Sequence, residues 1–263
     1  MLRNNVSDAV ALQSAFGFPA KVSKNPLRGR CFYDRRGDLA GYLFTLAGMS
    51  VGGVSATALV SEDARSDRYI GFLARIVRAC DRSKLSVYAS GESNGIGPET
   101  RIVMSLPPAA LLLDRLAGAL VRANSELRSR GFRLCIAFEA LDLASVREIR
   151  ELRKALYLLD DENIRLIMRN PELVSDAATH FAVIERAVSE FSVTPQWLGV
   201  GVCENSFDHS RYIEQVTKLG NAIHEGGKSV IFEGVGNSWQ ESFVTSLPVS
   251  LFSPSGADGD VYV

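Results

Sequence analysis

The segment Lys228-Ser-Val-Ile-Phe-Glu-Gly-Val-Gly-Asn237 decides the fold predicted for this chain of 263 residues. Residues 229–232 predict a parallel strand buried on both faces, because a continuous apolar run after two glycines has no polar face to show to water. Glu233 would lie at the carboxyl end of that strand, where α/β proteins gather the loops that bind ligands. The adjacent glycines would allow backbone or ligand to approach closely. The alternative interpretation is a loop glutamate at a tight turn.

The composition is that of an ordinary globular protein. Hydrophobic residues make up 46% and charged residues 22% of the sequence, and this length can build one domain with a sizeable core. The formal net charge of -1 gives no electrostatic case for nucleic acid or an anionic membrane, although four arginines fall within 28–36. No stretch approaches the roughly 18 apolar residues of a membrane helix, and the amino terminus lacks the layout of a secretion signal. We therefore expect a cytoplasmic protein.

The cysteines and histidines show no spacing typical of a metal centre. The four cysteines are far apart, and we expect reduced thiols in a cytosolic core: Cys31, Cys80, Cys135 and Cys203. The three histidines fall in or beside predicted helices, where solvated or partly buried histidine is usual. The chain also contains no G-x-S-x-G elbow and no ordered phosphate-binding glycine loop.

From residue 68 onward, predicted strands and amphipathic helices alternate. Helices are predicted over 68–81, 107–127, 144–159, 175–191, 210–225 and 238–245, and strands over 85–89, 102–106, 132–138, 164–168, 198–202, 229–232 and 249–252. A hairpin precedes them, formed by 30–33 and 39–46 around a glycine turn. About eight strands, spaced by about 30 residues, predict a closed parallel α/β barrel, with an open doubly wound sheet as the main competitor. We expect an extension at 1–25, the barrel at 26–258 and a tail at 259–263.

In this order of elements the chain resembles the EAL-domain family, named for its Glu-Ala-Leu motif. Val230-Ile-Phe-Glu-Gly-Val235 is similar to the family segment V-[VI]-A-E-G-V-E-T, and Gln240 stands at its following glutamine. Phe32 to Tyr42 resembles the opening strand, turn and strand, and Ile136-Ala-Phe-Glu139 resembles the strand that ends in E-[IL]-T-E. Two shorter segments also match, 102–108 to V-N-L-S-P and 251–254 to F-S-x-P.

The resemblance implies an α/β fold, a modified (β/α)8 TIM-like barrel of EAL-domain type with an antiparallel first strand. It also implies metal-dependent hydrolysis of cyclic di-GMP, a bacterial second messenger. However, the positions that would carry this chemistry are largely replaced. The glutamate of the family name aligns with Leu43, a metal-binding asparagine with Ser105, and a pair of aspartates with Arg169 and Asn170. Three further sites are also replaced: Arg30 for a glutamine, Ala47 for an arginine, and Gly199 and Gly201 for a Lys-x-Asp pair.

A two-metal phosphodiesterase needs several carboxylates to hold its ions. Glu139 and Glu233 remain as remnants of the family site, and we expect them to pair with Arg169 or with loop amides. A cation at Arg169 would repel a metal ion. We therefore expect no catalytic residue, no metal ion and no cofactor.

Asp142 stands in for the second glutamate of E-x-x-E, although its preferred interpretation is a cap for the helix predicted from residue 144. If the chain binds a ligand, the candidate contacts are Asp142, Gly234, Gln240 and Arg169.

These departures favour a catalytically inactive EAL-like protein that binds an unidentified regulatory protein in a bacterial signalling pathway. A receptor that binds cyclic di-GMP without cleaving it is one alternative, and a metal-dependent phosphodiesterase with a divergent site is another. A receptor should keep the residues that bind guanine and phosphate, whereas Arg30 and Ala47 replace two of them. An unrelated α/β barrel enzyme and a homodimer also stay open. Neither nucleic acid nor a membrane is expected as a partner.

Overall fold

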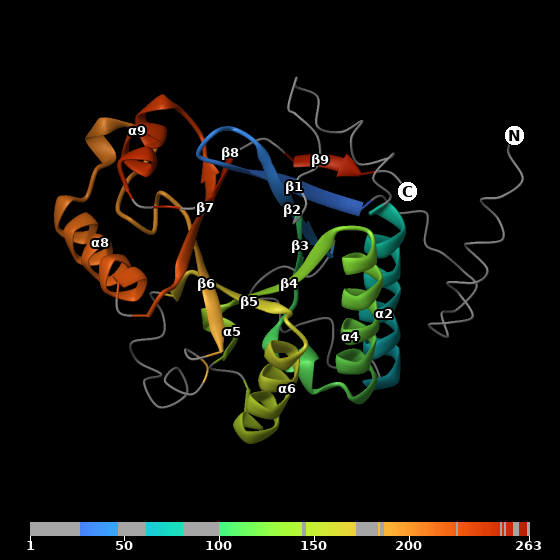
Figure 1. Cartoon of the computed structure of the whole chain (residues 1–263). Helices are drawn as coiled ribbons and strands as arrows, with labels where there is room; N and C mark the ends of the chain where they lie inside the picture. Colours follow the sequence, from blue (N-terminus) through green and yellow to red (C-terminus); the bar gives the residue numbers. More distant parts are fainter. Residues whose placement is uncertain are drawn as a thin grey trace, which may run out of the picture.

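The computed structural model describes residues 27–46, 62–80, 100–143, 146–171, 184, 187–224, 226–247, 249, 251–254 and 258–261. In these ranges, eight strands close into a barrel in chain order, and β8 pairs back with β1 (Figure 1). The strands are β1 (Leu27–Asp34), β2 (Leu39–Thr45), β3 (Thr100–Ser105), β4 (Phe132–Glu139), β5 (Arg165–Arg169), β6 (Val188–Val193), β7 (Ser229–Val235) and β8 (Leu251–Pro254). Strands β2 to β8 run parallel, whereas β1 is antiparallel to both neighbours. The predicted closed barrel with an antiparallel first strand is confirmed.

The β1–β2 hairpin closes through the turn that the sequence predicts. The Asp34 carboxylate accepts hydrogen bonds from the backbone N–H groups of Arg36 at 2.8 Å and Asp38 at 3.0 Å. Gly37 has a φ of +83°, a conformation that favours glycine. The hairpin therefore turns β1 against the direction of the other strands.

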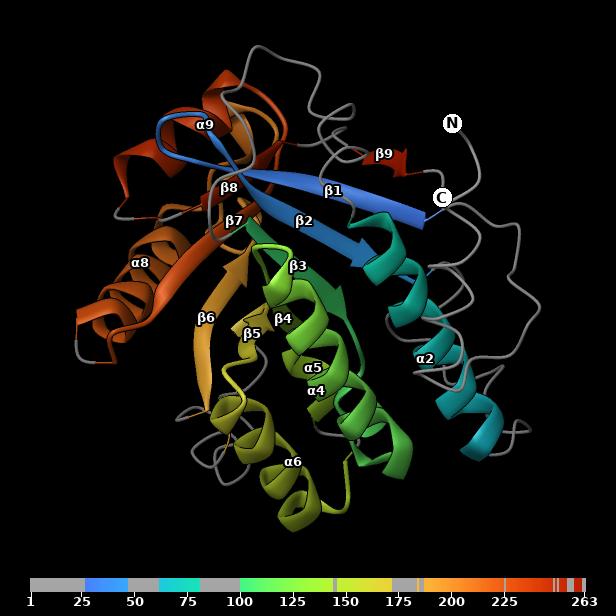
Figure 2. The same cartoon turned by 45° about the vertical axis from the view of Figure 1, so that its right-hand side comes forward.

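The described helices cover the outside of the barrel. They are α2 (Glu62–Ala79), η1 (Pro108–Leu112), α4 (Asp114–Ser129), α5 (Ala140–Leu143), α6 (Ile149–Asp161), η3 (Glu204–Ser206), α8 (His209–His224) and α9 (Ser238–Ser246). Helices α2, α4 and α6 gather on one side of the barrel, and α8 and α9 on the other (Figures 1 and 2). Beneath them, a separate apolar cluster fills the barrel interior: Phe32, Leu43, Val103, Cys135, Ala137, Ile167, Ile231 and Leu251.

The sequence prediction is wrong around β6. Residues 188–191, predicted to end a helix, begin strand β6. Residues 198–202, predicted as a strand, instead contain the end of a turn and one isolated β-bridge, between Val200 and Phe207. Glu190 and Ser192 alternate with the apolar Phe191 and Val193, and both are buried. A buried glutamate interrupts the continuous apolar run by which the other parallel strands are recognised. The residues aligned with a strand end, Gly199 and Gly201, therefore lie in a later connection.

Three other boundaries differ from the prediction. The helix expected over 107–127 is divided into η1 and α4. The helix expected from residue 144 begins at Ile149, after the separate turn of α5. The closing strand begins at Leu251, two residues later than expected. The extension 1–25 and the strand 85–89 lie outside the described residues.

Strand β9 (Asp258–Val261) pairs with β1 outside the closed ring, and the sequence assigns most of it to a tail. Among the described cysteines, Cys80 and Cys135 are buried, but Cys203 is exposed, so the expected core position is wrong for Cys203. None of the described helices is long and apolar enough to cross a membrane.

Candidate functional site

The carboxyl ends of β4 to β7 bring four polar side chains together at one mouth of the barrel. The strand register places Glu139 beside Arg169, and Arg169 beside Ser192. Glu233 approaches them from β7, on the far side of β6. Because alternate residues of a strand face the same side, the residues two positions earlier on β4, β5 and β7 form an apolar layer beneath this polar one.

Arg169 joins the two glutamates. Its Nε donates to Glu233 Oε1 at 3.0 Å and its Nη2 to Glu233 Oε2 at 2.6 Å, while its Nη1 lies 2.7 Å from Glu139 Oε1. The three side chains are only 16%, 8% and 10% exposed, respectively. Burial alone would lower the pKa of Arg169, but the carboxylates of Glu233 and Glu139 outweigh it and raise that pKa. The guanidinium is thus held as a buried cation.

Neutral donors complete the bonding of both carboxylates. The side-chain amide of Asn170 donates to Glu139 Oε2 at 3.0 Å, and the Ser192 hydroxyl donates to Glu233 Oε1. Asn170 adopts a φ of +48°, and its backbone N–H donates to the Ser192 carbonyl at 2.9 Å. Every oxygen of Glu139 and Glu233 therefore has a partner within the protein, a hydrogen bond or, for Glu139 Oε1, the ion pair with Arg169.

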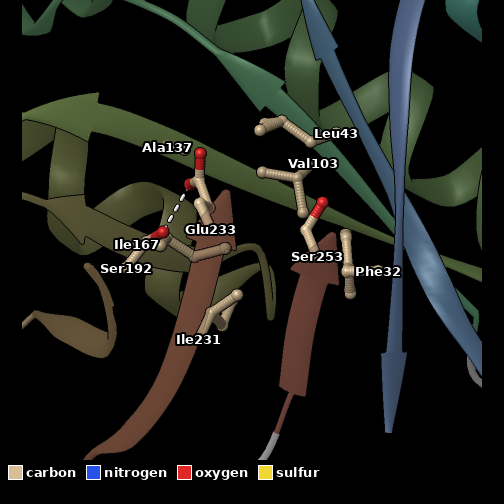
Figure 3. A pocket seen from close by; sticks show the side chains of 9 residues that line it. All are labelled: Phe32, Leu43, Val103, Ala137, Ile167, Ser192, Ile231, Glu233 and Ser253. Atoms are coloured by element: carbon tan, nitrogen blue, oxygen red, sulfur yellow. Dashed lines mark hydrogen bonds between the residues drawn. The ribbon is translucent and has the colours of Figure 1, made fainter. Parts of the chain in front are cut away.

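A small apolar cavity lies below this layer (Figure 3). Its volume is about 10 Å³, which is about the minimum for one water molecule. Leu43, Val103, Ala137 and Ile167 line it, and Glu233 and Ser192 enter from one side. The centre of the barrel is therefore filled by side chains.

The structure matches solved EAL domains closely in architecture. BlrP1 of Klebsiella pneumoniae, in a calcium/cy-diGMP complex at pH 8.0, matches with a TM-score of 0.61 at 13% sequence identity, over 96% of this chain and 64% of that one. An EAL domain protein of Listeria monocytogenes matches with a TM-score of 0.59 at 11% identity, over 97% and 92% of the two chains. The FimX EAL domain of Xanthomonas citri in complex with c-diGMP matches with a TM-score of 0.57 at 12% identity, over 95% and 91%. This chain has the EAL-domain fold.

The likeness is one of fold alone, because the sequences have diverged far. No protein-family model matches this sequence, and no curated protein matches it significantly. The chain spans just under two thirds of the BlrP1 chain that it matches, 64% of its length. The chemistry of this mouth therefore depends on the residues that the chain itself places there.

Those residues do not fit the divalent metal ions that the EAL fold implies. Leu43, which the sequence resemblance aligns with the family glutamate, lines the apolar cavity, and Ser105 offers only a hydroxyl. Arg169 lies between the two remaining carboxylates, at hydrogen-bond distance from both. Among the residues described, no three His, Cys, Asp or Glu side chains lie close enough to hold a metal ion. Among the described residues of the mouth, Glu139 and Glu233 supply the carboxylates, and Arg169 already contacts both of them.

The other candidate contacts are spread around this layer. Asp142 lies within α5 and does not cap α6, whose N-cap is Glu148, so the capping interpretation is wrong. Burial, followed by the charge of Glu139, raises the pKa of Asp142. Gly234 has a φ of +75° within β7, close after Glu233. Ala47 lies outside the described residues.

Gln240 connects two loops. Its side-chain oxygen accepts from the Gly236 backbone N–H at 2.8 Å, and its side-chain nitrogen donates to the Gly201 carbonyl at 3.1 Å. Asn237, the N-cap of α9, accepts from the Gln240 backbone N–H at 3.0 Å and donates to the Val202 carbonyl at 2.8 Å. Gln240 is 2% exposed, so its polar atoms serve the protein's own backbone.

Sequence reasoning missed two polar features. Ser192, and not Gly199 or Gly201, is the β6 residue at the level of Arg169. At the opposite end of the barrel, the fully buried Glu190 pairs with Arg101 at 2.5 Å and Arg165 at 3.0 Å. Alternation of polar and apolar residues over 190–193 is the signal that could have identified this strand.

Proposed function

We propose that this chain is a non-catalytic EAL-fold protein that acts by binding another protein in a signalling or regulatory pathway. The observation that carries the proposal is the position of Arg169, bonded to both Glu139 and Glu233. The two carboxylates that could take part in metal-dependent hydrolysis are bound instead to an internal cation.

A metal ion would have to compete with this guanidinium. Two unit positive charges about 4 Å apart repel by about 4 kcal/mol at an effective dielectric constant of about 20. A divalent ion would be repelled more strongly than a unit charge. Displacing Arg169 would break its three contacts with Glu139 and Glu233 and leave a buried cation without partners. Hydrolysis by metal-held water is therefore unfavourable at this mouth.

The same cluster is a poor receptor for a dianionic nucleotide. Its formal charge is negative, because Arg169 supplies one positive charge and Glu139 and Glu233 supply two negative charges. The BlrP1 and FimX complexes contain cyclic di-GMP, which makes a receptor the second candidate. A phosphate approaching the mouth of this chain, however, meets carboxylates and a guanidinium that is already bonded. We expect any dissociation constant for cyclic di-GMP to exceed about 10 μM.

The proposal is tested by separating the mouth from partner binding. Affinity-tagged wild-type protein and a Glu233→Gln variant are used to capture proteins from the native cytoplasm, and circular dichroism checks that the variant is folded. We expect both to retain the same partners, because the substitution changes only the charge of a buried side chain. Loss of every partner from the folded variant would assign the function to the mouth.

Calorimetry with cyclic di-GMP, with and without Mn²⁺, distinguishes the second candidate. A sub-micromolar dissociation constant would favour the receptor over the protein-binding hypothesis. Weak or undetectable binding would support the proposal.

A further inference from the structure

Helix α6 (Ile149–Asp161) carries a charge pattern that its own stability does not explain. Exposed residues around its first half are mainly basic, and those at its end are acidic: Arg147, Arg150, Arg153 and Lys154 against Asp160, Asp161 and Glu162. The helix dipole favours anions at the amino end and cations at the carboxyl end. The first turn does contain Glu151, but the acidic last turn has no basic residue. The end of the helix is therefore unfavourable in isolation.

The outer face of α6 is a single stripe. Leu152, Leu156 and Leu159 are buried, so the opposite face takes residues at i, i+4, i+7, i+8 and i+11. The stripe consists of Arg150, Lys154, Tyr157, Leu158 and Asp161, all exposed. Tyr157 and Leu158 are 40% and 42% exposed, which is unusual for large hydrophobic residues in the described part of this chain. Both overall views place α6 at the periphery of the molecule (Figures 1 and 2).

The charged ends of this stripe have no strong partner within the described ranges. No ion pair there involves Arg150 or Asp161, and Lys154 makes only a 3.8 Å contact with Glu151. The Arg153 guanidinium lies 5.3 Å from the centre of the Tyr157 ring, which orients that ring on the helix surface. The stripe thus presents a basic end, an apolar centre and an acidic end to solvent.

We propose that α6 is a homodimer interface in which the α6 helices of two copies pack antiparallel. Arg150 and Asp161 are separated by about 16 Å along the helix axis. A two-fold axis passing close to residues 155 and 156 brings Arg150 of each copy to Asp161 of the other. The same axis sets Lys154 over Tyr157 of the second copy, where its aliphatic stem and ammonium group can cover the ring.

A second copy of this chain is complementary in charge to this surface. An isologous interface must be complementary to itself, and a stripe that is basic at one end and acidic at the other meets this condition when reversed. One helix pair is a small interface, so we expect a dimer of micromolar affinity that weakens as salt rises from about 0.15 M to about 1 M. The interface does not depend on the chemistry of the barrel mouth.

Sedimentation velocity on the whole chain tests the interface, at about 5 to 200 μM protein. We expect the wild type to dimerise reversibly over this range. Arg150→Glu or Asp161→Arg alone turns both symmetry-related contacts repulsive, and each should weaken self-association at least about tenfold, or about 1.4 kcal/mol. Lys218→Glu on α8, which removes an exposed pair with Glu214, is the matched control and should dimerise like the wild type.

Mixing the two single variants gives the sharpest result. In the mixed dimer, each substituted residue faces an opposite charge, so an equimolar mixture should dimerise although neither variant does so alone. A chain carrying both substitutions should also recover self-association. A wild type that stays monomeric, or a mixture that stays monomeric while circular dichroism shows folded variants, would overturn the proposal. So would single variants that dimerise as well as the wild type.

Discussion

Arg169 and Glu233 form a two-point ion pair across the mouth of the barrel, with Nε–Oε1 and Nη2–Oε2 distances of 3.0 and 2.6 Å. The two residues come from β5 and β7, and Ser192 of the intervening β6 donates to the same carboxylate. This arrangement gives the chain an internal cation at the carboxyl ends of its strands.

Removing that cation should destabilise the fold. Arg169→Met leaves Glu139 and Glu233 buried without their shared partner, and we expect a loss of about 3 kcal/mol in the free energy of unfolding. Urea denaturation measures the change. Arg115→Met provides a control, because the Arg115–Asp67 pair is about half exposed on both sides and its loss should have little effect. Equal losses in the two variants would contradict the account.

Replacing the cation with a carboxylate should create a metal site. Arg169→Asp places a third carboxyl group beside Glu139 and Glu233, whereas Arg169→Asn removes the positive charge without adding a negative one. We expect Mn²⁺ to raise the Tm of the aspartate variant clearly and that of the wild type little or not at all, because ligand binding to the folded state stabilises it. Differential scanning fluorimetry with and without a chelator measures this. A wild type stabilised by Mn²⁺ as strongly as the variant would show that Arg169 does not exclude the ion.

Glu190 should be as important for stability as the residues of the mouth. It is fully buried and pairs with Arg101 and Arg165 at the other end of the barrel. Glu190→Gln leaves two cations without their shared charge, and we expect a loss of about 2–3 kcal/mol, measured by urea denaturation. Glu126→Gln, in the partly exposed pair with Arg130 on α4, should cost far less. A smaller effect at Glu190 than at Glu126 would refute this expectation.

Asp142 should make stability depend on pH. Burial and then Glu139 raise its pKa above the ordinary value of 3.8, so the folded state binds the proton more tightly than the unfolded state. The free energy of unfolding therefore falls as pH rises through the interval between the unfolded and folded pKa values, and the penalty is complete above that interval. Asp142→Asn should raise Tm modestly at about pH 7 and change it little at about pH 3. Melting curves of the wild type, Asp142→Asn and the exposed control Asp160→Asn across this pH range measure the effect. A Tm difference between Asp142→Asn and the wild type that stayed constant with pH would contradict the account.

Much of the barrel could be predicted because most of its strands and its hairpin turn are marked by residues that are close together in the sequence. Most parallel strands are short apolar runs, and the hairpin turn contains its own glycine and aspartate signals. Strand β6 could not be recognised in this way, because Glu190 is stabilised by Arg101 and Arg165, which lie 89 and 25 positions away in the sequence. A residue whose partners are so distant looks like a surface position in the sequence alone.

The candidate site was predictable in part for the same reason. The pairing of Arg169 with Glu139 and Glu233 follows from aligning three strand ends, and the structure contains it. Ser192 was missed because it belongs to the misplaced strand. The capping role expected for Asp142 depended on where α6 begins. The N-cap residue of α6 is Glu148, whose side chain makes no capping hydrogen bond, so the sequence does not mark that start clearly.

The central claim is that this EAL fold does not hydrolyse cyclic di-GMP, and its most direct test is an assay of the purified whole chain with the nucleotide and either Mg²⁺ or Mn²⁺. Chromatography of the reaction over hours separates the linear product from the cyclic substrate. The account predicts no product above a blank without protein, because Leu43, Ser105 and Arg169 leave too few oxygen ligands for the metal ions. Metal-dependent turnover that disappears in a folded Glu233→Ala variant would contradict it.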